Sequence, residues 1–330
     1  MTKSGTIINN KYELLTLIGQ GGMSYVYLAM DIKLNKKWAV KEIKKLGGVG
    51  DEIVINSIIQ ETNFLKKLDH PMLPRIVDIL DDNDSLYVVM DYIEGETLNV
   101  LLEKEGAQPE GIVIEWAKKL CDVLLYLHSQ NPPIIYRDMK PGNIILKPDG
   151  NIKLIDFGIA REYKNGSLGD TTVLGTIGYA APEQCVGQTD PRTDIYNLGA
   201  TLYHLLTGIS PCEPPYVLYP VRRINTDLSS GIEDIVIKCT EPDPRNRYRS
   251  CSELLYDLEN YMYYSCERRK KNFLNIIKII FQDRRKEIKY TEKHIEKNNI
   301  NNARYMAKNI VEMHKDDTNH LTLKGPYSDG

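Results

Sequence analysis

The sequence predicts an α+β protein with a small β-rich N-terminal part, a larger and mostly helical C-terminal part, and a helical, basic C-terminal extension. Residues 12–46 alternate β-prone segments with turns, which is typical of consecutive strands. Residues 110–129 and 194–207 instead repeat apolar side chains at helical spacing. From residue 265 onward, 15 Lys and Arg side chains stand against 9 Asp and Glu, so the extension is basic.

The composition excludes several classes of protein. In 330 residues, a hydrophobic content of 42% and a charged content of 26% are ordinary for a soluble globular chain and exclude disorder throughout. The net charge of −3 is unevenly spread, because the +6 of residues 265–330 leaves −9 for residues 1–264. An acidic body argues against nucleic acid as a partner.

Cysteine usage and the N-terminus indicate the compartment. The six cysteines form neither a CxxC pair nor a metal-binding spacing with histidine, so we expect buried free thiols in a reducing environment. Residues 1–15 lack the apolar core of a signal peptide. No stretch approaches the roughly 18 apolar residues of a membrane span. We therefore expect a cytoplasmic protein.

Three strands are expected within residues 12–46, and the turn between the first two is rich in glycine. In Ile18–Val26, glycines would let backbone N–H groups approach a phosphate without a Cβ in the way. Such hairpins are also common as purely structural elements. The third strand includes residues 38–41 and carries Lys41, although a single lysine in a strand usually lies at a solvated edge.

A tight loop over residues 135–143 is the centre of the predicted site. Apolar runs at 132–135 and 144–146 flank it, and we interpret them as buried strand ends. The following strand, residues 152–155, ends in a second polar loop. The two loops would bring four polar side chains into one cleft. These are Asp138, Lys140, Asn143 and Asp156.

The four side chains suit the transfer of a phosphoryl group. Asp138 would accept a proton from an attacking hydroxyl. Asn143 and Asp156 offer hard oxygen ligands of the kind that magnesium prefers. Lys140 would neutralise charge on the phosphoryl group in transit.

These loops resemble those of a known family. Residues 135–143 look like the catalytic loop of eukaryotic-like protein kinases, and residues 156–158 look like their metal-binding Asp-Phe-Gly motif. Residues 175–183 are similar to the end of the family's activation segment. Over about residues 12–264 the motifs follow in order, and the chain is similar to bacterial Hanks-type serine/threonine kinases.

Two further positions match contacts that the family uses to hold its catalytic loop and activation segment. Asp194 resembles the aspartate of a buried helix, expected over 194–207, that anchors the catalytic loop. Arg247 resembles an arginine in a late turn, which would pair with Glu183.

The resemblance implies a two-lobed protein-kinase fold and a division of the chain. Residues 1–11 would be an N-terminal segment, and residues 265–330 the basic, partly helical tail. Between them would lie the kinase domain of residues 12–264, with an N-lobe of about 12–91 and a C-lobe of about 95–264. The expected activity is transfer of the γ-phosphoryl group of ATP, with Mg²⁺ or Mn²⁺, to serine and threonine hydroxyls of proteins.

The resemblance also assigns roles to residues. Asp138 would orient the acceptor hydroxyl. Lys140 together with Thr176 matches the residue pattern of kinases that act on serine and threonine. Lys41 would hold the phosphates and pair with Glu61, in a helix expected over residues 51–68. Asn143 and Asp156 would bind two metal ions. ATP would contact Ile18, Gly19, Gln20, Gly21, Gly22, Met23, Ser24, Val26, Ala39, Lys41, Met90, Tyr92, Asn143, Ile145 and Asp156.

The chain departs from the family pattern at two positions. Ser24 stands where the third glycine is usual, and Tyr136 stands where most members have histidine. Tyr136 would fill the same apolar slot, stacked with Phe157 and Leu65, so we expect activity to survive. These departures are the only support for an alternative, a nucleotide-binding pseudokinase scaffold. A third hypothesis, a small-molecule phosphotransferase, is opposed by the kinase-like activation segment.

A regulatory switch is expected in the segment 161–172. Arg137 directly precedes the catalytic aspartate and favours an anion nearby. A phosphate on Thr171 or Thr172 would pair with Arg137 and order the segment. We expect this phosphorylation to occur between two molecules in a transient homodimer. Thr176 is expected to make a structural contact to the catalytic loop instead.

The tail carries an amphipathic segment between two basic clusters. Phe273–Phe281 places its apolar residues on a helical face, and Arg268–Lys271 and Arg284–Lys286 flank it. A helix at a membrane surface and a helix folded onto the kinase body or a partner protein are the two interpretations. Residues 268–286 are therefore expected to contact a membrane or a partner, in addition to the protein substrates of the kinase domain.

Overall fold

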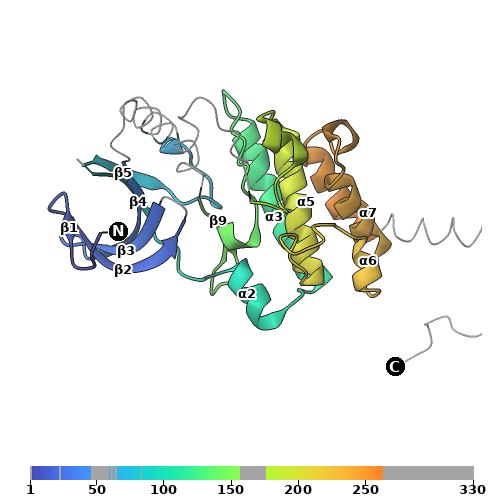
Figure 1. Ribbon diagram of the computed structural model, residues 1–330, viewed down its shortest axis with the longest axis horizontal. Coiled ribbons are helices and arrows are strands. Elements are labelled where there is room, and N and C mark those ends of the chain that lie inside the picture. The colour runs from blue at the N-terminus through green and yellow to red at the C-terminus, as the bar shows by residue number, and fades with distance from the viewer. Residues whose placement is uncertain are drawn as a thin grey trace, which may run out of the picture. The chain divides into compact units, whose positions relative to one another are not determined.

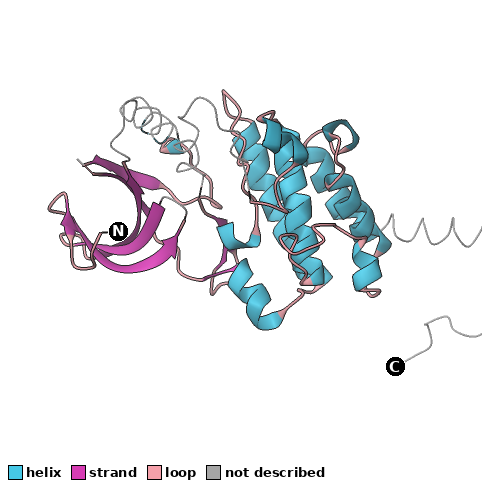
Figure 2. Cartoon of the chain, in the orientation of Figure 1, coloured by secondary structure: helices cyan, strands magenta, loops and turns pink. Residues whose placement is uncertain are grey.

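The computed structural model divides the chain into two compact units, residues 1–265 and residues 266–330. It describes residues 2–21, 24–45, 59, 62, 65–82, 84–156 and 176–262. All of these belong to the first unit, whose curled sheet and helical bundle are seen in Figure 1 and, by secondary structure, in Figure 2. The tail segment 268–286 lies outside the described residues, and so do Gly22, Met23, Glu61, Phe157, Thr171 and Thr172.

The N-terminal part is an antiparallel sheet in the order β1-β2-β3-β4-β6-β5. All neighbouring strands in it pair antiparallel. The strands are β1 (Ile7–Ile8), β2 (Tyr12–Gln20), β3 (Ser24–Asp31), β4 (Lys36–Lys44), β5 (Ile76–Asp81) and β6 (Ser85–Asp91). The three strands expected within residues 12–46 are confirmed as β2, β3 and β4. The first of them extends to Gln20, into the range 18–26 that was expected to be a turn.

The C-terminal part combines a small sheet with helices. The small antiparallel sheet has the order β7-β8-β9, formed by β7 (Glu96–Thr97), β8 (Ile144–Leu146) and β9 (Ile152–Leu154). The helices are α2 (Leu98–Glu105), α3 (Glu110–His128), α5 (Pro191–Thr207), α6 (Val221–Ile224) and α7 (Ser230–Cys239), and residues 251–262 are also helical. Short 3₁₀ turns occur at η1 (Pro141–Asn143), η3 (Pro182–Val186) and η4 (Pro244–Asn246).

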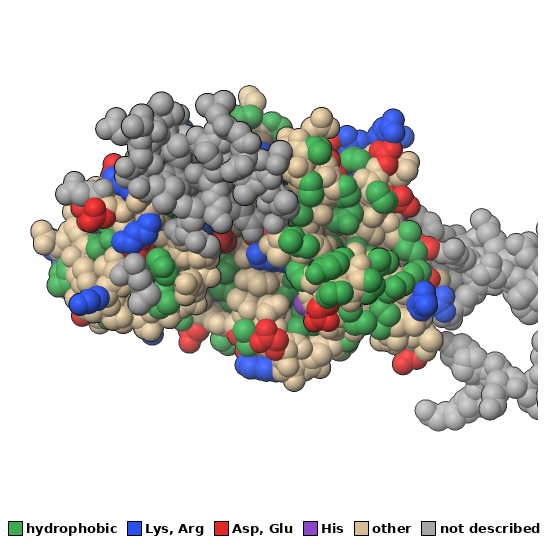
Figure 3. All heavy atoms as spheres, viewed as in Figure 1, with side chains coloured by type: hydrophobic (Ala, Val, Ile, Leu, Met, Phe, Trp, Pro, Cys, Tyr) green, Lys and Arg blue, Asp and Glu red, His purple; other side chains and the backbone are tan. Residues whose placement is uncertain are grey.

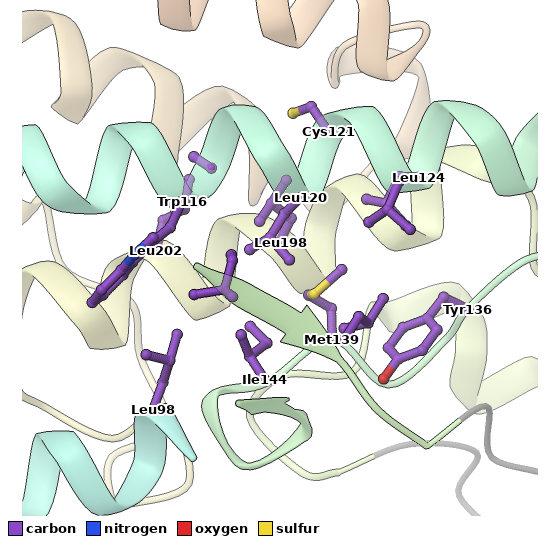
Figure 4. Close-up of a cluster of buried hydrophobic side chains, with 14 of the residues drawn as sticks. Leu98, Trp116, Leu120, Cys121, Leu124, Tyr136, Met139, Ile144, Leu198 and Leu202 are labelled. Carbon is purple, nitrogen blue, oxygen red and sulfur yellow. The ribbon is translucent and has the colours of Figure 1, made fainter. Parts of the chain in front are cut away.

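The core of the C-terminal part lies between α3 and α5. Apolar side chains of both helices meet there, among them Leu120 and Leu198, with Met139 and Ile144 beside them (Figure 4). All four of these side chains are fully buried. The loop of residues 135–143 and β8 therefore rest directly on the hydrophobic core, which fixes their position.

Helix α5 begins three residues earlier than the sequence pattern predicted. Asp190 caps it by accepting a hydrogen bond from the backbone N–H of Arg192, and Pro191 occupies its first turn. Both residues are typical of helix starts. Asp194 consequently lies inside the first turn of the helix rather than at its start, with its side chain completely buried.

The prediction of a strand end at residues 132–135 is wrong. The structure has no strand there, and the prolines have no N–H with which to join a ladder. Ile134 instead donates its N–H to the carbonyl of Leu127, at 3.1 Å, which ties the segment to the end of α3. The predicted helix and strand at 110–129 and 152–155 each end one residue earlier, at His128 and Leu154.

Two further expectations fall only partly on described residues. Of the helix expected over residues 51–68, the described members Ile59, Thr62 and Leu65 are helical. Residues 66–68 are described too and are not helical, so the predicted end of this helix is wrong. No helix within the described part of the chain is both long enough and apolar enough to cross a bilayer.

Candidate active site

The catalytic loop is anchored by one buried carboxylate at the start of α5. Asp194 accepts hydrogen bonds from the backbone N–H groups of Tyr136, at 2.9 Å, and Arg137, at 2.7 Å. The His128 Nε2 atom, at the end of α3, lies 2.8 Å from the same carboxylate. Hydrogen bonds to a charged acceptor are stronger than those between neutral groups. Asp194 therefore joins two helices to the loop, as the resemblance implied.

The loop is held in an unusual backbone conformation. Arg137 has a φ of 67°, in the left-handed region that non-glycine residues seldom adopt. Such a residue costs about 1–3 kcal/mol and persists only where its surroundings fix it. Besides Asp194, the Gln184 side-chain amide donates to the Arg137 carbonyl at 2.9 Å, and the Thr201 hydroxyl donates to the Met139 carbonyl at 3.0 Å. The residue between them, Asp138, is thus fixed from both sides.

Asp138 is the centre of a compact polar cluster. Thr176 donates its hydroxyl to Oδ1 at 3.0 Å, and Lys140 Nζ lies 3.2 Å from Oδ2 and 2.7 Å from the Thr176 oxygen. Asn143 Nδ2 donates to Oδ2 at 2.8 Å. Only 5% of Asp138 is exposed. The predicted contact of Thr176 with the catalytic loop is confirmed.

A second contact joins the N-terminal sheet to the loop after β9. Lys41, in the middle of β4, places its Nζ 2.6 Å from Asp156 Oδ1. The lysine side chain is 4% exposed and the aspartate side chain 41% exposed. Lys41 is therefore buried rather than at a solvated edge. The expected pairing of Lys41 with Glu61 falls on a residue outside the described part.

The two clusters are connected through the backbone. Ile155 donates its N–H to the carbonyl of Asn143 at 2.8 Å, and Asp156 follows directly. Asp156 also has a left-handed φ of 65°. The Tyr136 hydroxyl donates to the Ile155 carbonyl. The structure thus brings Asp138 and Asp156 onto two adjoining loops, as predicted.

Tyr136 plays a part that the sequence pattern did not reveal. Its side chain is 3% exposed and belongs to the same buried core as Leu65, as an apolar slot would require. Its hydroxyl, however, also makes the bond to the loop before Asp156, which an apolar interpretation of the position misses. His128 and Gln184 were missed too, because their partners are distant in sequence.

The donor set fits a magnesium ion held partly by a bound phosphate. Asn143 uses Nδ2 in its bonds to the Asp138 carbonyl and carboxylate, both 2.8 Å, so its amide oxygen is the atom suited to a cation. The partly exposed Asp156 carboxylate would add a charged ligand. Across the described residues, His, Cys, Asp and Glu side chains form no cluster of three or more that would hold a metal by themselves. Magnesium is often bound by one or two protein groups together with phosphates.

The residues expected around a nucleotide lie on neighbouring strands. Ala39 of β4 is opposite Met90 of β6, and Val26 of β3 is opposite both Gly19 and Lys41. Tyr92 follows β6, and Ile145 lies on β8 of the smaller sheet.

Ser24, in place of a glycine, closes the turn between β2 and β3. Gly21 donates its N–H to the Ser24 carbonyl at 2.8 Å. A Cβ at Gly21 would lie 3.0 Å from the Ser24 hydroxyl oxygen, so glycine allows this close approach. Ser24 is 7% exposed, and it is its backbone carbonyl that closes the turn by accepting this bond.

Glu183 and Arg247 form the predicted ion pair, in a two-pronged geometry. The Arg247 Nη1 and Nη2 atoms lie 2.6 and 2.9 Å from the two carboxylate oxygens. Burial alone would raise the pKa of Glu183, but the hydrogen bonds from Arg247 hold it below its usual value. Arg247 is fully buried and also donates to the carbonyls of Glu241, Arg192 and Pro242.

Comparisons with known proteins agree with this geometry. The family model described as "Protein kinase domain" matches residues 12–258. Over 268 residues, the chain is 36% identical to the probable serine/threonine-protein kinase CPE1738 of Clostridium perfringens, covering 77% of this chain and 39% of that protein. It is 32% identical to serine/threonine-protein kinase PrkC of Bacillus subtilis, covering 77% and 41%. The chain thus matches about two fifths of the length of these relatives.

A solved structure shows the same fold. The crystal structure of residues 1–466 of Rad53 in complex with AMP-PNP aligns with a TM-score of 0.63 and 25% identity. The alignment covers 74% of this chain and 64% of that one.

Proposed function

Because the chain belongs to the protein kinase family and resembles its bacterial serine/threonine members, we propose that it transfers the γ-phosphoryl group of ATP to serine and threonine hydroxyls of proteins. The observation that carries the proposal is the cluster around Asp138, with Lys140, Asn143 and Thr176 in hydrogen-bond contact. Phosphoryl transfer depends mostly on positioning and charge neutralisation, because its transition state is loose.

Asp138 would orient the attacking hydroxyl and accept its proton. Its carboxylate is held by Thr176 and Asn143, so that it is already placed when the substrate arrives. Lys140, between Asp138 and Thr176, would stabilise the negative charge of the phosphoryl group. The pairing of Lys140 with Thr176 supports the choice of serine and threonine.

Lys41, Asn143 and Asp156 would hold the phosphates and the metal. Magnesium, or manganese, would supply positive charge at the phosphates when bound. Asp156 and the Asn143 amide oxygen would be its protein ligands, and Lys41 would exchange its contact with Asp156 for one with a phosphate. Adenine would lie between Ile18, Val26, Ala39 and Ile145, with Met90 at its border. The AMP-PNP in the related Rad53 structure supports ATP as the nucleotide.

Exposed apolar side chains on the helical part, one of them next to Thr176, favour a polypeptide over a small molecule. Ile177 directly follows Thr176 and is 65% exposed, and Tyr216 and Val217 are 58% and 51% exposed. Figure 3 shows apolar side chains gathered over the helical part on one face. Such surfaces on soluble proteins mark binding sites for other proteins.

Further proposals concern organisation and regulation. The kinase domain would span residues 12–264, and the protein would work in signalling in the cytoplasm. The tail segment 268–286 would bind a membrane or partner.

Autophosphorylation on Thr171 or Thr172, in a transient homodimer, would create a phosphate that pairs with Arg137. Mass spectrometry after incubation with magnesium and ATP would locate the modified residue.

A transfer assay tests the activity. The purified chain is incubated with labelled ATP, magnesium and a generic protein substrate, beside the variants Asp138→Asn and Asp149→Asn. Asp149 pairs with Lys147 on an exposed turn and serves as the control. We expect the Asp138 variant to lose transfer by about 10²–10⁴-fold while the control retains it. ATP binding without transfer in the wild type would instead identify a pseudokinase, and transfer only to small hydroxyl compounds would identify a small-molecule phosphotransferase.

A further inference from the structure

A basic depression lies on the N-terminal part, beside the start of β4. Its cavity volume is about 460 Å³, within the range of ligand sites. Its walls are the starts of β4 and β5 and the segment 66–69, and none of the predicted catalytic or nucleotide-binding residues lines it. A binding role here would therefore be separate from phosphoryl transfer.

The charge of this depression opposes that of the surrounding protein. Four cationic side chains line it, Lys36, Lys66, Lys67 and Arg75, against the single carboxylate of Asp69. Residues 1–264 as a whole carry −9. A local excess of positive charge on an acidic body attracts an anionic ligand and steers its approach.

The cations differ in how far they are already paired. Arg75 binds Asp91, with Nε 2.9 Å from Oδ2, and Lys36 Nζ lies 3.9 Å above the ring of Trp38. Lys66 and Lys67 are exposed and have no ion pair with any carboxylate in the described part of the chain. Their two charges are available to a ligand.

Trp38 contributes its ring to the wall of the depression, with the Lys36 ammonium group above it. The residue is 7% exposed, and its Nε1–H makes no hydrogen bond with any described residue. Buried polar groups in native proteins nearly always have a partner, and an unpaired one costs free energy. Because the Nε1 atom is itself buried, a ligand in the depression would contact the indole ring rather than its N–H.

The walls are fixed in place without a ligand. The start of β4 is paired with β6, and Asp91 of β6 holds Arg75. Asp69 donates its backbone N–H to the Tyr126 hydroxyl of α3 at 2.9 Å, which ties down the segment 66–69. A preformed site loses less conformational entropy on binding than a mobile one.

We propose that this depression binds an acidic peptide segment of a partner protein, with carboxylates facing Lys66 and Lys67. Leu68 and Ile76, which also line it, would contact an apolar side chain of the same segment. The volume exceeds that of a lone inorganic anion. A nucleic acid backbone needs a longer basic track, which an acidic body does not offer.

The binding experiment uses the full chain without ATP, so its result does not depend on catalysis. The probe is a fluorescein-labelled peptide with three glutamates on each side of a leucine, and fluorescence anisotropy measures its binding. We expect saturable binding that weakens with salt, and no binding of the peptide with glutamine in place of glutamate. The Lys66→Ala/Lys67→Ala variant should raise the Kd about tenfold or more.

A matched variant removes the same charge elsewhere on the same part of the chain. Lys33 and Lys37 are exposed but do not line the depression, so Lys33→Ala/Lys37→Ala should bind the peptide as the wild type does. The proposal is overturned by equal loss in both lysine variants, by no loss in the Lys66/Lys67 variant, or by no saturable binding. Tighter binding of a single-stranded oligonucleotide at the same lysines would also overturn it, in favour of nucleic acid.

Discussion

At the scale of single residues, Lys41 and Asp156 form the contact that links the N-terminal sheet to the loop after β9. Lys41→Met and Asp156→Asn each remove a charge that would be needed mainly in the transition state. We expect each to lower phosphoryl transfer by roughly 10²–10³-fold or more. Circular dichroism and thermal unfolding should show a folded protein in both cases.

The control for this prediction lies on the same strand. Lys37 of β4 is exposed, so Lys37→Met should keep transfer near the wild-type rate. Wild-type turnover in a folded Lys41→Met protein would contradict the proposed role of the lysine.

Glu42, next to Lys41, is the basis of a separate prediction about how the stability of the fold depends on pH. Its side chain is fully buried and binds Lys44, Thr2 and Tyr27. Burial alone would raise the pKa of Glu42, but the bonds from Lys44, Thr2 and Tyr27 lower it to about 2 from a usual 4.5. A carboxylate whose pKa is lower in the folded state stabilises the fold above about pH 4.5, and this contribution is lost as the pH falls towards 2.

Glu42→Gln should therefore be less stable than the wild type at pH 7, with a gap that narrows between pH 4.5 and 2. Urea unfolding at a series of pH values measures the gap. Glu105→Gln removes one carboxylate at an exposed position instead and should leave stability at pH 7 close to that of the wild type. A constant gap down to pH 2 would show that the negative charge of Glu42 does not contribute.

At the scale of elements, helices α5 and α7 meet at a glycine. A Cβ on Gly199 would lie 2.5 Å from the Cβ of Cys239 and 2.9 Å from Cγ2 of Thr240. Although alanine is the better helix former, Gly199→Ala should destabilise the fold by about 1–3 kcal/mol through overpacking. Thermal or urea unfolding measures the effect.

Gly111 of α3 provides the matched control. A Cβ there would meet no atom within 4 Å. Gly111→Ala should leave stability unchanged or raise it by up to about 1 kcal/mol. If both variants behaved alike, the close approach of α5 to α7 would not be the cause.

The same scale shows what could be predicted from the sequence. The loops that hold Asp138 and Asp156 were predictable, because the spacing of polar residues between apolar segments is a local signal. The start of α5 was predicted three residues too late, although Asp190 and Pro191 are residues typical of a helix start. The strand expected at 132–135 was wrong, because apolar character alone does not supply a pairing partner.

Contacts between distant segments were the least predictable. Two examples are the contact of Asp194 with His128 and the hydrogen bond from Tyr136 to Ile155. Both depend on side-chain positions that residue spacing does not predict. The basic depression joins β4, β5 and residues 66–69, and its charge emerges only when these segments come together.

At the scale of the whole molecule, the proposed catalytic residues all lie in the first unit, before residue 266. Deleting residues 268–330 should therefore leave the specific activity towards a generic protein substrate within about twofold of the full chain, a change of less than ~0.5 kcal/mol in barrier. Activity and sedimentation of the truncated and full-length proteins test this. Complete loss of transfer in a folded, soluble truncation would place the tail within the catalytic machinery.

The anchoring of the catalytic loop by Asp194 has a consequence for how the site would respond to displacement. The position of Asp138 is fixed by α3 and α5, whereas the position of Lys41 is fixed by the sheet. If the sheet moved relative to the helices, the distance between Lys41 and Asp156 would therefore change. Asp138 would keep its position relative to α3 and α5. A regulator that moved the sheet would therefore change the proposed phosphate contacts of Lys41 without displacing the Asp138 carboxylate that is proposed to receive the hydroxyl proton.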